Sequence, residues 1–235
     1  MSFLGHLGEL RVRLSRALLV LALCFAVAWS QSGRIFRILL DPLQPYLNGR
    51  KPVFIELTEP FLLYMKVSLL AAIFAASPVI LYELWAFVSP GLYPKERKYV
   101  APFVIVASLL FLGGGLFGYY IGFPYAARFL LSVAGDFEPA LTVKSLFGFE
   151  SKIILGMGLV FEMPAVIFLL SRLGIVTPQF LLHHLKYAVL IIFIVAAIIT
   201  PTPDVITQCV FALPMIGLYL LGIGAAYLVP HRDGR

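Results

Sequence analysis

The sequence predicts an all-α polytopic membrane protein, with six kinked transmembrane helices in a single domain that covers residues 1–235. Of the 235 residues, 61% are hydrophobic and only 13% are charged, and the mean hydropathy is +0.97. A soluble domain of this length would need far more polar surface. A helix that crosses the hydrocarbon core needs about 20 mostly apolar residues, and several segments meet that requirement.

Six apolar segments, each closed by Gly, Pro or charged residues, are the predicted spans. They cover residues 15–33, 61–87, 99–123, 149–171, 187–200 and 205–229. Arg11 to Arg16 precede an apolar run that ends in Ala26-Val27-Ala28, which resembles the cleavage site of a signal peptide. Glu9 lies where such a leader would be purely basic, so we expect the segment to remain as the first helix.

Small residues and prolines shape the predicted bundle. Gly114, Gly118 and Gly122 recur at every fourth position of the third span, which lets another helix approach closely. We expect that helix to belong to the same chain rather than to a second copy. Prolines inside or at the ends of spans should kink them and favour a cup- or glove-shaped bundle. These are Pro78, Pro102, Pro124, Pro164 and Pro214.

The fifth predicted span is short. Lys186 and the Thr200-Pro201-Thr202-Pro203-Asp204 break leave roughly 13 residues, or about 20 Å of helix against a core of about 30 Å. Such a mismatch should thin the bilayer locally or tilt the helix.

The basic residues favour a cytoplasmic amino terminus by a small margin. With that orientation ten Lys and Arg residues lie inside: Arg11, Arg13, Arg16, Lys95, Arg97, Lys98, Arg172, Lys186, Arg232 and Arg235. Seven lie outside: Arg34, Arg37, Arg50, Lys51, Arg128, Lys144 and Lys152. The outer segments also hold seven carboxylates, Glu150 among them, so the inner face is the basic one. We therefore expect an inner-membrane protein with both termini in the cytoplasm and no role in nucleic-acid binding.

Two carboxylates are expected at the cytoplasmic face. Glu9 precedes Arg13 by four residues, so the two could simply form an ion pair on one helix. Glu96 lies in the charged turn from Ser89 to Lys98, where it could simply complement the dipole of the third span. Presented together, the two acids could instead bind a ligand with two adjacent guanidinium groups.

Glu162 is an ionisable residue inside the fourth predicted span. Such residues are rare in membrane helices and usually functional, although a carboxyl group hydrogen-bonded to a neighbouring helix is the plainer alternative. Pro164 leaves a backbone carbonyl free one turn earlier, so polarity gathers at this depth.

No pattern typical of an enzyme, a metal site or a cofactor site is present. The four histidines, His6, His183, His184 and His231, are not spaced as metal ligands, and no hydrolase, zinc-protease or phosphate-loop motif occurs.

Several separate patterns share one order along the chain. They are His6-Leu7-Gly8-Glu9-Leu10-Arg11-Val12-Arg13; Asp41-Pro42-Leu43; Thr58-Glu59-Pro60-Phe61 with Lys66; Phe87 with Pro90-Gly91-Leu92-Tyr93-Pro94-Lys95-Glu96-Arg97; Phe161-Glu162-Met163-Pro164; and Thr200-Pro201-Thr202-Pro203-Asp204 with Gln208. In these patterns, over nearly its whole length, the chain resembles the TatC subunit family of the twin-arginine protein translocase.

The resemblance implies a receptor for the paired arginines of signal peptides on folded cargo, which is exported with the proton-motive force. It makes Glu9 and Glu96 the counter-charges and has Arg11, Phe87 and Arg97 shape the site. It also implies contacts with the TatA and TatB subunits along the fifth and sixth spans, and assembly with other copies of the chain. Further positions carried by the resemblance are Glu162 and Gln208 as polar contacts, and Pro42, Lys66 and Asp204 as motif residues.

Two other classes of function remain open from the residues alone. A secondary transporter would use Glu162 as a proton-coupled site, but it would usually show repeated halves with broken helices. A structural scaffold would only pack partner helices, and its activity should survive the loss of Glu9 and Glu96.

Overall fold

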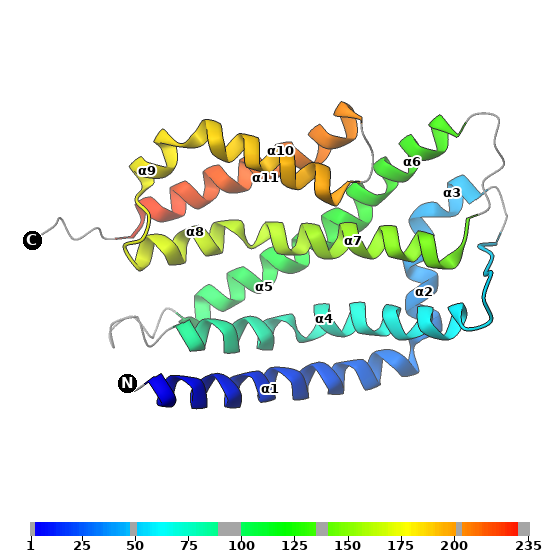
Figure 1. The fold of residues 1–235 in the computed structure, drawn as a ribbon, viewed down its shortest axis with the longest axis horizontal. Helices are drawn as coiled ribbons and strands as arrows, with labels where there is room; N and C mark the ends of the chain where they lie inside the picture. Colours follow the sequence, from blue (N-terminus) through cyan, green and yellow to red (C-terminus); the bar gives the residue numbers. More distant parts are fainter. Residues whose placement is uncertain (1–2, 48–50, 89–99, 135–140, 201–203, 230–235) are drawn as a thin grey trace, which may run out of the picture. The chain divides into compact units, whose positions relative to one another are not determined.

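The computed structural model describes residues 3–47, 51–88, 100–134, 141–200 and 204–229, and every element in these ranges is a helix. Within them, five helical segments are long and apolar enough to cross a membrane: Leu7–Ser30, Glu59–Phe87, Pro102–Val133, Val143–Arg172 and Val205–Tyr227. A shorter apolar helix covers Leu185–Ile199. The prediction of an all-α multi-pass membrane protein is therefore confirmed (Figure 1).

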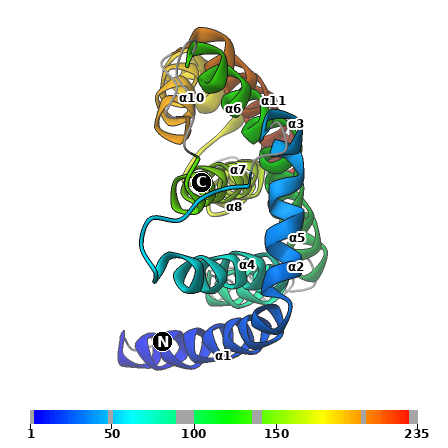
Figure 2. The ribbon, with the colours of Figure 1, turned by 90° about the vertical axis from the view of Figure 1, so that its right-hand side faces the viewer.

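The chain forms two compact units, one of residues 1–112 with 139–151 and one of residues 113–138 with 152–235. In the first unit, α1 (Phe3–Ser30) and α4 (Glu59–Val88) lie side by side and antiparallel (Figures 1 and 2). Three short helices lie between them in the sequence: α2 (Ser32–Leu40), η1 (Asp41–Leu43) and α3 (Gln44–Leu47).

Aromatic contacts join the elements of the first unit. The ring of Trp29 at the end of α1 meets Phe61 at the start of α4, with centroids 5.7 Å apart. Farther along α4, Trp85 packs edge-on against Phe103 of α5 (Val100–Phe117) at 4.0 Å. The first contact holds α1 against α4, and the second holds α4 against α5.

The second unit contains the end of α5, the π-helix η4 (Gly118–Gly122), α6 (Phe123–Val133) and the later helices. The later helices are the end of α7 (Val143–Phe161), α8 (Met163–Arg172), α9 (Pro178–His183), α10 (Leu185–Ile199) and α11 (Val205–Tyr227). Helix α11 packs against both α8 and α10. The Tyr219 hydroxyl of α11 donates a hydrogen bond of 3.0 Å to the Leu181 carbonyl, which ties α9 to this packing.

Three predicted spans have different ends in the structure. Helix α1 begins at Phe3 rather than at residue 15, the third helical segment continues to Val133, and α7 begins at Val143. Glu150, expected in an outer segment, therefore lies within α7 and is buried. A hydropathy pattern marks only the apolar part of a helix. The helix itself is longer, because its backbone hydrogen bonds continue through the flanking polar residues.

The prolines act differently from one helix to another. Pro124 and Pro164 occupy the first turns of α6 and α8, where a missing amide hydrogen breaks no helical bond. The chain leaves regular α-helix just before both, as η4 before α6 and as a turn at Glu162 before α8. Pro78 and Pro214 lie inside α4 and α11, which continue past them.

The glycine repeat of the third span is used for packing within the chain, as expected. A Cβ atom at Gly114 would overlap the carbonyl oxygen of Met157, and one at Gly118 would lie 3.0 Å from the Cα atom of Ile154. A Cβ atom at Gly122 would come within 2.8 Å of the ring of Phe211 on α11. The first two glycines therefore set the close approach of this segment to α7.

Gly114→Ala is expected to lower the free energy of unfolding by about 1–3 kcal/mol, because the Met157 carbonyl belongs to a helix backbone and cannot rotate away. The matched control is Gly113→Ala, since a Cβ atom there would meet nothing within 4 Å. Thermal unfolding of both variants in detergent measures the effect. Equal stability of the two variants would contradict the close packing at Gly114.

Candidate functional site

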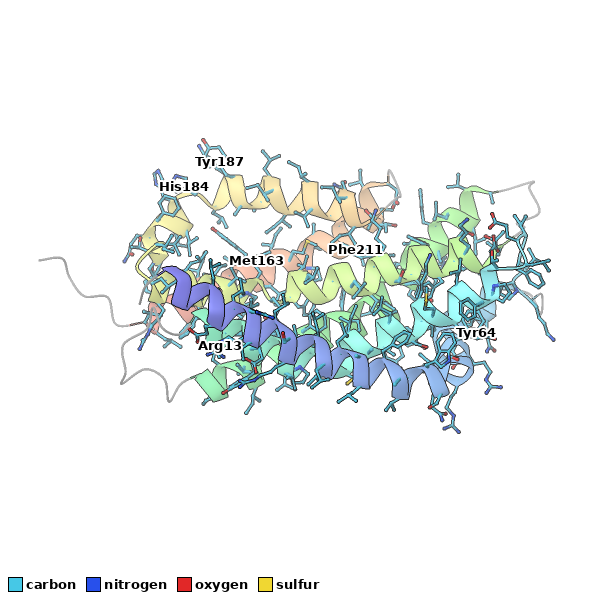
Figure 3. All side chains as sticks on the ribbon, turned by 60° about the horizontal axis from the view of Figure 1, so that its bottom comes forward. Arg13, Tyr64, Met163, His184, Tyr187 and Phe211 are labelled. Carbon is cyan, nitrogen blue, oxygen red and sulfur yellow. The ribbon has the colours of Figure 1, made fainter. Side chains whose placement is uncertain are left out.

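A buried carboxylate and a half-buried one hold a guanidinium group between α1 and α4. We call Glu9, Arg13 and Glu83 the α1–α4 charge cluster. Arg13 donates from Nε and Nη2 to Glu9 Oε1, at 3.0 and 2.7 Å, and from Nη1 to Glu83 Oε2 at 3.1 Å. Arg16 Nη1 lies 3.8 Å from Glu83 Oε1. Figure 3 labels Arg13 on α1.

The spacing on α1 explains half of the cluster. Residues four apart lie one above the other on a helix, so Glu9 and Arg13 form an i,i+4 pair. This pair was one of the two interpretations of Glu9 from the sequence, and the structure contains it. Glu83 joins from α4, 70 residues away, and its side chain is only 9% exposed.

Of the other residues expected around Glu9, Phe87 lies on the side of α4 that carries Glu83, whereas Arg11 does not share the side of α1 that carries Glu9. Phe87 follows Glu83 by one helical turn on α4, so both lie on the same side of that helix. Arg11 is exposed on α1, two residues from Glu9, and so points to a different side of the helix. Glu96 and Arg97 lie outside the described residues, as does the rest of the turn from residue 89 to 98.

Sequence reasoning missed Glu83 altogether. Its signal was available, because a carboxylate inside an apolar span is the same feature that singled out Glu162. The spacing of four residues indicates Arg13 only as a surface partner of Glu9. The structure shows that Arg13 serves two carboxylates from different helices.

Glu162 lies at the junction of α7 and α8, directly before Met163. Figure 3 labels Met163, the first residue of α8. Glu162 is buried, and its Oε1 atom accepts no hydrogen bond from any described residue. Glu150 Oε1, earlier on α7, is likewise buried and accepts no hydrogen bond from the described residues. A buried carboxyl oxygen without a partner is costly, so Glu162 is a candidate contact for a group outside this chain.

Gln208 and Asp204 have definite contacts near the start of α11. Gln208 donates from Nε2 to the Phe193 carbonyl at 2.9 Å and so links α11 to α10. Asp204 caps α11, because its Oδ2 accepts from the Thr207 amide at 2.6 Å. Residues 201–203 of the same motif lie outside the described residues.

The two remaining motif positions, Pro42 and Lys66, lie apart from the charge cluster in the sequence. Pro42 is in η1, beside the buried Leu43, and Lys66 is exposed on α4. In the described ranges, no group of three or more His, Cys, Asp or Glu residues could hold a metal ion.

Comparison with known proteins gives the family. The family model for Sec-independent protein translocase protein (TatC) matches residues 5–214. The TatC protein of Koribacter versatilis is 44% identical over 239 residues, which cover 100% of this chain and 88% of the relative. The TatC protein of Desulforapulum autotrophicum is 45% identical over 234 residues, which cover 98% and 86%.

A solved structure agrees with these relatives. The crystal structure of the twin-arginine translocase receptor TatC in DDM matches with a TM-score of 0.81 and 34% identity, covering 96% of this chain and all of the other. These matches identify the chain as a transport protein rather than an enzyme. This multi-pass membrane chain therefore belongs to the TatC family of Sec-independent protein translocase proteins.

Proposed function

We propose that this chain is the signal-peptide receptor and core subunit of a twin-arginine translocase. The observation that carries the proposal is the bond between Glu9 and a guanidinium group, which Arg13 supplies within the chain. Both bonds go to Glu9 Oε1, and Oε2 accepts none from the described residues. Glu9 can thus accept a second guanidinium, that of an arginine in a signal peptide. Glu96 would be its partner carboxylate, with Arg11, Phe87 and Arg97 around them.

In the proposed topology, the chain lies in the inner membrane and crosses it six times. Both termini are then in the cytoplasm. Helix α10 would be the fifth span. Its 15 residues extend about 22 Å, against about 30 Å for the hydrocarbon core, so the bilayer would thin beside it. This orientation brings the charge cluster and the basic residues to the cytoplasmic leaflet.

Partner subunits of the TatA and TatB type would assemble beside the short fifth span and α11, together with other copies of this chain. Support comes from Glu162, whose buried carboxyl oxygen accepts no hydrogen bond from the described residues. Gln208 uses Nε2 on Phe193, which leaves its side-chain oxygen as the atom for a partner. Folded cargo would then cross with the proton-motive force.

The test is equilibrium binding of a fluorescent twin-arginine signal peptide to the purified protein in detergent, compared with the same peptide carrying Lys-Lys. We expect the Lys-Lys peptide to bind at least tenfold more weakly, because an ammonium group cannot reproduce the planar, bidentate bonds of a guanidinium. Fluorescence anisotropy measures the dissociation constants of both peptides. Equal binding of the two peptides would contradict the receptor role and favour a scaffold instead.

A further inference from the structure

Arg13 donates hydrogen bonds to both acids of the α1–α4 charge cluster, and each acid accepts them through only one of its two carboxylate oxygens. Glu9 uses only Oε1 for Arg13, and Glu83 uses only Oε2. The second oxygen of Glu83 faces Arg16 at 3.8 Å, which is beyond hydrogen-bond range, and the Arg16 side chain is 64% exposed. Arg16 therefore contributes little to the electrostatic interactions of Glu83.

The charges of the three hydrogen-bonded residues explain what Glu83 does for Glu9. Glu9, Arg13 and Glu83 together carry one negative charge, from two carboxylates and one guanidinium. Without Glu83, Arg13 and Glu9 would form a neutral pair on α1. A neutral pair attracts a further cation far less than a cluster with a net negative charge does.

The position of Glu83 also determines where the remaining charge is. The Glu83 side chain is 9% exposed, whereas that of Glu9 is 25% exposed. A cation arriving from solvent therefore reaches Glu9 rather than Glu83. The bond from Nη1 to Glu83 ties Arg13 to α4, and the Oε2 atom of Glu9 accepts no hydrogen bond from the described residues.

We propose that Glu83 is a positioning residue for the receptor site: by sharing Arg13, it keeps Glu9 negatively charged toward an incoming guanidinium group. This inference rests on the proposed function, because it concerns the affinity of that same site. Glu83 itself does not touch the signal peptide. The residue acts through Arg13, whose charge it balances.

Glu83→Gln is expected to weaken binding of the twin-arginine peptide about tenfold, because the three-residue cluster becomes neutral. The double variant Arg13→Gln with Glu83→Gln has one negative charge again, on Glu9. We expect it to recover binding to within about threefold of the unmodified protein. If Glu83 served only to fasten α1 to α4, the double variant, which also lacks that link, would bind as weakly as the single one.

Two further variants keep the test decisive. Arg13→Gln alone leaves two negative charges and should bind the peptide at least as tightly as the unmodified protein. Glu59→Gln also removes a buried carboxylate from α4, at the other end of the helix, and should leave peptide binding unchanged. Thermal unfolding of each variant separates a loss of fold from a loss of affinity. If Glu83→Gln does not fold, a loss of binding in a folded Arg13→Gln variant overturns the inference.

The outcomes separate this inference from the function on which it rests. An unmodified protein that binds Arg-Arg and Lys-Lys peptides equally contradicts the receptor role. An unmodified protein that discriminates between them, with a Glu83→Gln variant of full affinity, overturns only the role of Glu83. Weak binding by both the single and the double variant overturns it as well.

Discussion

Glu9→Gln is expected to weaken binding of the twin-arginine peptide roughly ten- to a hundredfold. A hydrogen bond to a charged group contributes about 1.5–3 kcal/mol, and each 1.4 kcal/mol corresponds to about a factor of ten in affinity. The amide keeps the shape of the side chain but removes its charge and one of its acceptor oxygens. Arg13 then remains with Glu83 alone, so the cluster becomes neutral and attracts the cationic peptide less than before. Fluorescence anisotropy with the detergent-solubilised protein measures the change.

The control for Glu9 is Glu56→Gln, which removes an exposed carboxylate outside the charge cluster. This variant should bind the peptide as the unmodified protein does. The Lys-Lys peptide should lose less affinity than the Arg-Arg peptide when Glu9 is replaced, since it never makes the bidentate bond. A Glu9→Gln variant with unchanged affinity would show that the Glu9–Arg13 pair is only a surface ion pair.

Much of the fold follows from composition, because helices in lipid must be long, apolar and internally hydrogen-bonded. The short α10 and the packing of Gly114 and Gly118 within the chain were both predicted from local patterns. The helix ends were not. Helix α1 continues to Phe3 through charged residues, which no hydropathy pattern marks as part of a span.

The candidate site was predictable only where its residues share a helix. The Glu9–Arg13 pair follows from a spacing of four. The bond from Arg13 to Glu83 joins residues 70 positions apart, and it depends on how α1 is aligned along α4. That alignment is set by side-chain packing, such as Trp29 against Phe61, which no spacing rule specifies. The link from Gln208 to Phe193 was missed for the same reason.

Glu162→Leu is expected to change stability and transport in opposite directions. The buried Oε1 atom of Glu162 accepts no hydrogen bond from the described residues, so a leucine should raise the free energy of unfolding by about 1–3 kcal/mol. The same substitution should reduce export of a folded substrate, because it removes the polar contact proposed for partner or cargo. Thermal unfolding in detergent measures the first effect, and export into membrane vesicles with the partner subunits measures the second.

Ser171→Ala is the matched control for Glu162, because Ser171 Oγ lies on the following helix, α8, and is likewise buried without a hydrogen bond from the described residues. It should stabilise the protein slightly and leave export intact. Glu162→Gln keeps a polar group at the same depth and should retain more export than Glu162→Leu. If Glu162→Leu is less stable than the unmodified protein, the carboxyl group is satisfied within the fold. If it is more stable and exports normally, Glu162 has no part in transport. Increased stability with reduced export, and neither alone, indicates a carboxyl group kept for a partner outside the chain.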